Sequence, residues 1–567
     1  MQGSLVPRNS YANKQSLRQK QLVRLSKFSL ALIPLLLILT SGLTGNTVRA
    51  KMNVGPAYKQ ATNSSAVLTY KKDRTRTGQF SNETNLTPGN VNVAQFGKRV
   101  SYPVDGQVYA EPLYIPNLSI KGTLYNVVIV ATQHDSIYAF DADQTSTAPP
   151  LWHTSFLGSG ITSVPSKQVS CDDIAPEYGI TSTPVIDRSN NTLYVVANTM
   201  EHAANTYRLH AINITTGLEK QASTKITATT AGNGLGSVNG KITFNPVISI
   251  QRTGLLLANA HIFLAFAAHC DNGNYHGWIM SYDSATLKQT SVYNVTPGGF
   301  AGGVWESGAG LAADAHNHIY VISGNGSFSY NIGGKDLGQS FIKLDTTRGI
   351  LNVLDAFTPF NQTCLNIGDH DVGSGGAITL PDNELLGVGK EGRIYLLNQN
   401  HLGGFTAIAN PCSNMKLTNI DKIIQETPPN TAHGGVWGTP AYWNGSKNQY
   451  VYVSGVGDHL KAFKFVNGKL SLPASSQTSQ TFDFPGANPV VSSNANASGT
   501  GIVWTLDDTA TLRAFNAEDL SDELYNSKQN GSRDKPGSYV KFSVPTIANG
   551  EVFVGTKNSL VIYGELA

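Results

Sequence analysis

Side chains that can do acid-base chemistry or bind ligands stand directly before or after many of the short apolar segments of the chain. They comprise carboxylates, imidazoles, amides, one lysine, one tyrosine and two tryptophans: Gln107, Glu111, His134, Glu177, Tyr178, His269, Asn272, Trp305, Glu306, Asn325, Asp369, Asp371, Lys390, His433, Trp437, Asp458 and His459. Gathered on one concave face, they would line a ligand pocket. The alternative is that they line a wet central channel and bind nothing.

The elements that must position these residues belong to one repeated unit, seen most clearly in residues 302–327. A Gly-rich strand (307–313) meets a polar turn, and an alternating β-branched and aromatic strand (318–323) follows. Eight versions of the unit begin at Ala110, Thr181, Asn245, Ser307, Gly373, Gly438, Asn488 and Ser543. Their spacing of about 50 to 70 residues is typical of four-stranded antiparallel blades. The sequence therefore predicts an all-β chain that forms a single eight-bladed β-propeller.

The antiparallel order of the strands predicts which residues meet. If the first strand of each blade runs down beside the axis and the second returns, residues before the first strand and after the second emerge on the same face. The polar residues described above occupy these positions, so we expect them on one face.

The propeller is predicted to span residues 78–567 and to be closed by its own N-terminal strand. Residues 96–106 read as a lone strand without blade partners, whereas the last repeat ends after three strands. Pairing these two segments would complete the last blade and remove both open edges.

The first 77 residues are predicted to lie outside the propeller. Residues 1–50 contain seven basic and no acidic residues, an apolar run over 28–39, and a small-residue cleavage site near Ala50. This pattern is typical of a signal peptide and a secreted or extracytoplasmic protein. The run is shorter than the roughly 20 residues of a membrane span, so an uncleaved anchor is the weaker alternative. Residues 51–77 read as a linker or loose arm.

Charge and cysteine content argue against nucleic-acid binding, a zinc ribbon and covalently bound haem. The whole chain carries 41 Lys and Arg against 38 Asp and Glu; without the seven basic residues of 1–50, 34 remain and the net charge is −4. No basic patch for nucleic acid is therefore expected. The four cysteines are Cys171, Cys270, Cys364 and Cys412, and none has zinc-ribbon or haem spacing. One or two disulfides are expected in an exported protein, with three full pairings open.

Three segments resemble the dehydrogenases that depend on pyrroloquinoline quinone (PQQ). GGVWESGAGLAADAHNHIYVISGNGS, GDHDVGSGGAITLPDNELLGVGKEGRIYLLNQ and HCDNGNYHGWIMSYD are similar to the stretches that carry the cofactor, base and metal residues of PQQ-dependent alcohol dehydrogenases. The match is clearest over residues 265–400. The resemblance implies bound PQQ and Ca²⁺, and oxidation of an alcohol or sugar hydroxyl with a separate electron acceptor.

The resemblance also implies roles for individual residues. Trp305 matches the tryptophan on which the flat cofactor stacks, and Lys390 matches the basic residue that contacts the quinone oxygens, where a cation stabilises developing charge. Trp437, the second indole, is predicted as another cofactor contact. Asp371, or Asp369 two residues earlier, matches the general base. The metal ligands are predicted to be Asn325, Asp371 and Asn272.

Several departures keep other functions open. Asn272 stands where the family has a glutamate calcium ligand, His276 replaces an arginine, and no vicinal cysteine pair exists. One alternative is a non-catalytic extracellular propeller that serves as a binding or assembly scaffold for an unidentified ligand. Another is a hydrolase that uses His433 or His134, although no motif supports it.

Overall fold

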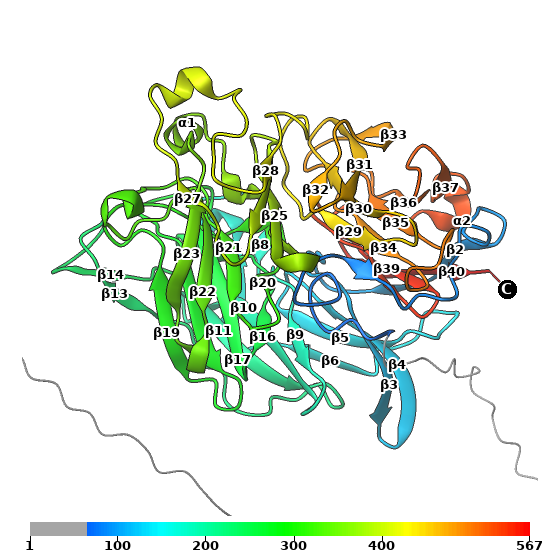
Figure 1. Cartoon of the computed structure of the whole chain (residues 1–567). Helices are drawn as coiled ribbons and strands as arrows, with labels where there is room; N and C mark the ends of the chain where they lie inside the picture. Colours follow the sequence, from blue (N-terminus) through cyan, green and yellow to red (C-terminus); the bar gives the residue numbers. More distant parts are fainter. Residues whose placement is uncertain (1–64, 567) are drawn as a thin grey trace, which may run out of the picture. The chain divides into compact units, whose positions relative to one another are not determined.

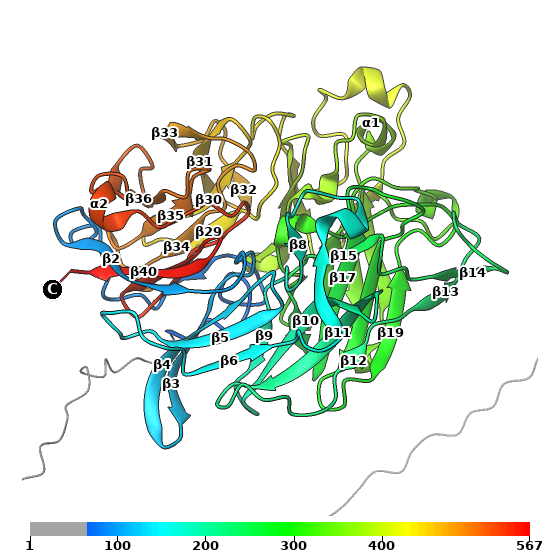
Figure 2. The same ribbon diagram turned by 180° about the vertical axis from the view of Figure 1, so that it is seen from behind.

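The computed structural model describes residues 65–566, which contain eight blade sheets of four to six strands (Figures 1 and 2). The eight-bladed propeller predicted from the sequence is confirmed. The predicted signal peptide lies outside the described residues. Within residues 65–566, no helix is long and apolar enough to cross a membrane.

Blades one to four follow in chain order. Blade one comprises β3 (Leu113–Ile120), β4 (Thr123–Ala131), β5 (Ser136–Asp141) and β6 (Trp152–Ser155). Blade two comprises β9 (Val185–Asp187), β10 (Thr192–Glu201), β11 (Ala204–Asn213) and β12 (Thr224–Lys225), and β7 (Ile161–Pro165) and β8 (Glu177–Tyr178) extend it. Blade three comprises β15 (Ser249–Gln251), β16 (Leu256–Ala258), β17 (His261–Ala268), β18 (Trp278–Asp283) and β19 (Gln289–Asn294). Blade four comprises β20 (Ala312–Ala313), β21 (Ile319–Ile322), β22 (Phe341–Asp345) and β23 (Asn352–Thr358), with β27 (Gly404–Phe405) alongside.

Blades five to eight repeat the pattern. Blade five comprises β24 (Ile378–Leu380), β25 (Glu384–Val388), β26 (Ile394–Asn398) and β28 (Gln425–Glu426). Blade six comprises β29 (Ala441–Asn444), β30 (Gln449–Ser454), β31 (Asp458–Val466), β32 (Lys469–Leu470) and β33 (Ser476–Phe482). Blade seven comprises β34 (Val490–Ser492), β35 (Ile502–Leu506), β36 (Leu512–Asn516) and β37 (Glu523–Asn526). Blade eight comprises β38 (Thr546–Ala548), β39 (Glu551–Gly555), β40 (Ser559–Glu565) and β2 (Phe96–Pro103).

Two strands far apart in the sequence meet in blade eight. Strand β2 pairs antiparallel with β40, with Phe96 opposite Glu565 and Pro103 opposite Ser559. Figure 1 shows the blue β2 beside the red β40. Each strand covers an edge that the other would leave open.

The segment 67–83 runs along the inner edges of the blades. Its backbone carbonyl groups accept hydrogen bonds from the first strands of six blades. The donors are the backbone N–H groups of Tyr114, Ile186, Ala313, Thr379, Tyr442 and Val491, in blades one, two, four, five, six and seven. In blade three, Thr69 and Arg76 donate to Leu255 O, and in blade eight, Glu83 accepts from Gly550 N. The innermost strand of a blade leaves one row of backbone groups unpaired, and this axial segment satisfies part of that row.

The structure differs here from the loose arm predicted over residues 51–77. Residues 51–64 lie outside the described residues, but Lys71 and Arg76 are fully buried. The Lys71 ammonium donates to the carbonyl oxygens of Thr439 (2.6 Å), Pro440 (3.2 Å) and Pro489 (2.9 Å). Three carbonyl acceptors match its three donors, which makes burial of the charge tolerable.

The core lies between the sheets and is divided into clusters shared by neighbouring blades. Trp278, Trp443 and Trp504 are among its largest fully buried side chains. Trp443 donates to Ser493 Oγ of the next blade at 3.1 Å. The alternation of the strands places these indoles between sheets, whereas Trp305 and Trp437 are only partly buried.

Candidate functional site

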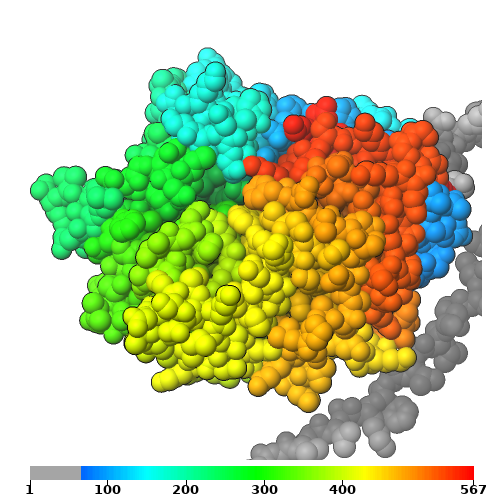
Figure 3. All heavy atoms as spheres, turned by 90° about the horizontal axis from the view of Figure 1, so that it is seen from above, coloured from blue at the N-terminus to red at the C-terminus, as the bar shows by residue number. Residues whose placement is uncertain are grey.

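A cavity of about 230 Å³ is located where inner segments of several blades converge. Its walls include Trp305, Asp371, Lys390 and Trp437. Figure 3 shows the molecule hollowed where its green segments meet the orange and red ones. Neither His134 nor His433, the residues of the hydrolase alternative, lines the cavity.

Trp305 is held at the cavity by a turn with unusual backbone geometry. Glu306 and Ser307, which follow it, have left-handed φ angles of 42° and 51°. Such angles cost non-glycine residues about 1–3 kcal/mol each and persist only where surrounding bonds fix them. Glu306 accepts from Ile322 N at 2.8 Å, and Ser307 Oγ donates to Ser374 O at 2.6 Å. These bonds to the next strand and the next blade fix the turn that carries the indole.

Asp371 and Lys390 form a largely buried ion pair beside Trp305. Lys390 Nζ is 2.6 Å from Asp371 Oδ2 and 5.8 Å from the centroid of the Trp305 ring. Burial raises the pKa of Asp371, and Lys390 and the Asn325 N–H offset only part of that effect. Burial alone would lower the pKa of Lys390, but Asp371 and Asp369 outweigh it and raise it above its usual value. A carboxyl with a raised pKa beside a fixed cation is suited to proton transfer.

Gly324 permits the close approach of this carboxylate to the indole. A Cβ atom at Gly324 would lie 2.5 Å from Asp371 Oδ1 and 3.4 Å from Trp305 Nε1. A contact of 2.5 Å is sterically impossible, so any side chain at this position would displace Asp371. The glycine in the sequence GNGS is therefore required by the site and not only by the turn.

Asn325 and Asp369 lie next to Asp371, and both are engaged with protein partners. The Asn325 N–H donates to Asp371 Oδ1 at 2.6 Å, and its side-chain amide donates to Asp369 Oδ1 at 2.6 Å. The Asn325 Oδ1 atom accepts from Gln339 Nε2 at 2.5 Å. Asp369 also contacts Lys390 Nζ at 3.0 Å, and it is exposed. Gln339 is a supporting residue that sequence reasoning did not identify.

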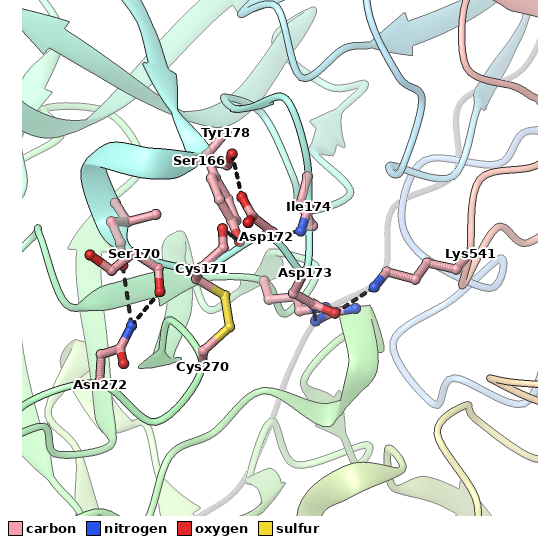
Figure 4. The surroundings of a disulfide bond; sticks show 12 residues. Ser166, Ser170, Cys171, Asp172, Asp173, Ile174, Tyr178, Cys270, Asn272 and Lys541 are labelled. Atoms are coloured by element: carbon pink, nitrogen blue, oxygen red, sulfur yellow. Dashed lines mark hydrogen bonds and ion pairs between the residues drawn. A yellow bond between two sulfur atoms is a disulfide. The ribbon is translucent and has the colours of Figure 1, made fainter.

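Asn272 is not brought together with the other two predicted metal ligands. Its amide nitrogen donates to the backbone oxygens of Val169 (3.2 Å) and Ser170 (2.9 Å), as Figure 4 shows, and it does not line the cavity. Lys390 also contacts the Asp371 oxygen that a bound cation would need. Calcium requires six to eight oxygen ligands, and the described residues do not fit it.

Arg252 is a cavity residue that the sequence did not predict. Its Nη1 donates to Asp173 Oδ2 at 3.1 Å, its guanidinium packs 4.2 Å from the ring centroid of Phe542, and its side chain is 6% exposed. Its Nη2 is buried and has no hydrogen-bond partner among the described residues. A buried donor without a partner is costly, and Arg252 is among the residues that line the cavity. The arrangement is therefore suited to a ligand oxygen, such as a carboxylate.

Arg252 was missed because the first strand of blade three is interrupted. Both β15 and β16 pair with β17, and residues 252–255 leave the ladder between them. In the sequence, residues 251–254 are typical of a turn that ends a strand, and such a turn would lie on the opposite face. The turn actually occurs at Asn259 and Ala260, whose φ angles are 49° and 58°. Asn tolerates left-handed backbone angles, so Asn259 was the residue in the sequence that could have indicated this turn.

A disulfide between Cys171 and Cys270 forms another part of the wall (Figure 4). It joins the loop before β8 to the turn after β17. Asp173, two residues beyond Cys171, pairs with both Arg252 and Lys541. Burial alone would raise the pKa of Asp173, but the two cations hold it below its usual value. The carboxylate therefore stays ionised and anchors Arg252.

Aromatic rings complete the cavity. Trp437 and Phe484 meet edge to face with centroids 5.6 Å apart, and Phe484 meets Phe542 in the same way at 5.9 Å. His269 packs edge-on against Tyr178, and burial lowers its pKa to about 4, so it is neutral at pH 7. The cavity thus combines flat apolar walls with fixed charges, a combination typical of sites for planar polar ligands.

Comparisons with known proteins support the fold and do not assign the activity. No protein-family model matches the chain, and no curated protein matches it. Among solved structures, it is similar to the quinohemoprotein alcohol dehydrogenase ADHIIG from Pseudomonas putida HK5 (13% identity, 88% of this chain and 80% of that chain covered, TM-score 0.57). The quinohemoprotein alcohol dehydrogenase from Comamonas testosteroni (12%, 89% and 81%, 0.56) and a europium-containing methanol dehydrogenase (11%, 88% and 98%, 0.57) are also similar. The quinoprotein-like propeller predicted from the sequence is confirmed at the level of fold.

Proposed function

We propose that this protein binds a planar anionic quinone of the PQQ type and oxidises a small alcohol or sugar hydroxyl. The observation that carries the proposal is the convergence of Trp305, Asp371 and Lys390 in one cavity whose wall also holds the unpartnered donor of Arg252. When bound, PQQ would supply the acceptor for the two electrons of the alcohol. A separate acceptor would then reoxidise it.

The residues fit such a quinone better than they fit a metal. Trp305 and Trp437 offer flat surfaces, and Arg252 offers a free donor for a carboxylate of the ligand. Lys390 stands beside Asp371, where its ammonium would stabilise negative charge on a ligand oxygen. We therefore propose that Lys390 acts without a resident calcium ion. The raised pKa of Asp371 suits it to accept the hydroxyl proton of the substrate.

The test is a titration of the full chain with PQQ, in the presence and absence of a calcium chelator, followed by tryptophan fluorescence. Saturable quenching that the chelator leaves unchanged is expected. Arg252→Ala should weaken binding at least tenfold, whereas Arg208→Ala, which removes an arginine paired with Glu201 away from the cavity, should not. Dye reduction with a panel of alcohols and sugars should be lost in Asp371→Asn while binding remains.

A second function is favoured by the separation of Asn272 from the other two predicted metal ligands. The protein would then be a non-catalytic scaffold whose cavity holds a ligand without turnover. Saturable binding of PQQ without dye reduction by any substrate would support this alternative. The absence of both PQQ binding and turnover would overturn the quinone proposal.

A further inference from the structure

A group of three potential metal ligands lies at the other end of β20 from Trp305, in the turn that leads to β21. Asp314, His316 and His318 each offer one ligand atom, and these atoms all lie within 4.8 Å of one another. In residues 65–566 this is the only such group of three His, Cys, Asp or Glu. Neither the quinone proposal nor the calcium prediction uses any of the three.

The carboxylate of this group is held rigidly before any ion arrives. Asp314 Oδ1 accepts from the backbone N–H groups of His316 (2.8 Å) and His318 (2.9 Å). Its Oδ2 accepts from His318 Nδ1 at 2.8 Å and from the Tyr320 hydroxyl at 3.0 Å. Hydrogen bonds of this kind orient ligands in metal sites.

The two imidazoles are accessible from outside. His316 is exposed, His318 is partly exposed, and their ring centroids are 5.8 Å apart. Arg74 fixes the turn by donating to Asn317 Oδ1 at 2.5 Å. A hollow of about 420 Å³, whose walls include Asp314, His316, Asp73 and Asp382, lies beside the group. It offers room for water or another ligand to complete a coordination shell.

We propose that Asp314, His316 and His318 bind a divalent transition metal such as Zn²⁺. Two imidazole nitrogens and one carboxylate oxygen suit Zn²⁺, Ni²⁺ or Cu²⁺, whereas Ca²⁺ prefers oxygen ligands alone. Three protein ligands leave a position open, which is typical of exchangeable or catalytic sites. A metal bound at His318 Nδ1 would take the place of the hydrogen bond from this atom to Asp314, and the imidazole would carry its proton on Nε2.

The opposing explanation is that the Asp314–His318 hydrogen bond only braces the turn. The chain contains a matched pair for comparison: His401 Nδ1 lies 3.5 Å from Asp355 Oδ2 and has no third ligand within reach among the described residues. If a histidine-carboxylate pair sufficed, His401 would bind metal as well. The third ligand, His316, is therefore the residue to remove.

Zn²⁺ binding to the untagged, chelator-stripped full chain should be measured by isothermal titration calorimetry, with Co²⁺ absorption as a second probe. One equivalent is expected, weakened at least tenfold in His316→Ala and His318→Ala and unchanged in His401→Ala and Asp371→Asn. Millimolar Ca²⁺ should not displace it. The absence of a stoichiometric equivalent, equal binding by His316→Ala, or displacement by Ca²⁺ would each overturn the assignment. Because His316 is exposed, its removal leaves the fold intact.

Discussion

At the scale of single residues, the site is governed by charges that burial has placed close together. Asp371 is pulled in two directions, since burial and the Asp369 carboxylate raise its pKa while Lys390 lowers it. Each neighbour can be removed separately by mutation. The sign of each effect on Asp371 follows from its charge.

We predict that the acid limb of the pH-rate profile shifts in opposite directions in two variants. Lys390→Gln removes the cation and should move the limb to higher pH. Asp369→Asn removes a like charge and should move it to lower pH. Turnover against pH in PQQ-loaded protein measures both. Shifts of the same sign would exclude Asp371 as the titrating base.

Glu306 provides a second prediction, on stability. Burial raises its pKa to about 8, so the folded state holds a proton that the unfolded state releases from about pH 4.5 upward. The stabilisation from this group is full below pH 4.5 and is lost as the pH rises to about 8. Glu306→Gln cannot ionise, so its Tm relative to that of the parent should rise between pH 5 and pH 8. Parallel Tm curves would show that Glu306 is ionised in the fold.

At the scale of elements, two disulfides hold loops that the blade repeat does not require. Cys171–Cys270 forms part of the cavity wall, whereas Cys364–Cys412 joins α1 (Gln362–Ile367) to the loop before β28. The sequence left three full pairings open because pairing depends on which loops meet in the ring. Comparing the two disulfides therefore separates the effect of a bond in the cavity wall from that of a bond elsewhere.

We expect the two disulfides to separate stability from ligand binding. Each double Cys→Ser variant should lose about 2–4 kcal/mol of stability, because each bond restricts the unfolded chain. Only Cys171→Ser/Cys270→Ser should also weaken quinone binding, by about tenfold, because it loosens the loop that carries Asp173 and so anchors Arg252. Denaturant melts and fluorescence titrations of both variants provide the comparison. Equal affinities would show that the wall is rigid without its disulfide.

Local patterns predicted the repeated strands well and the interruptions between them poorly. All eight repeat starts lead into the first strand of a blade, because alternation of apolar and polar residues reports which face of a strand is buried. The position of Arg252 was not predicted, because two short strands in one line resemble a strand followed by a turn. The hydrogen-bond partners of Asn272 were not predicted either, since Val169 and Ser170 lie about 100 residues earlier in the sequence.

At the scale of the whole molecule, the burial of the axial segment 67–83 could not be predicted from the sequence. Lys71, Lys72, Arg74 and Arg76 gave it the composition of a solvated linker. The acceptors that make burial of Lys71 possible are carbonyl groups about 370 to 420 residues away. Composition reports the cost of burying a charge but not the partners that compensate for it.

Removal of residues 548–567 is predicted to unfold the whole propeller. The deletion takes away β39 and β40, which leaves β2 and β38 without partners and opens the ring. Circular dichroism should show loss of the cooperative transition of the parent. A truncated chain that melts cooperatively at the parent Tm would contradict this.

The axial segment has a consequence for the order of assembly. It leaves the ribosome before any blade exists, yet its hydrogen-bond partners include Val491 and Gly550, near the end of the chain. Contacts of such long sequence separation form slowly. Co-translational folding can therefore build individual blades, but the hub on which they converge is finished only after residue 550 has been synthesised.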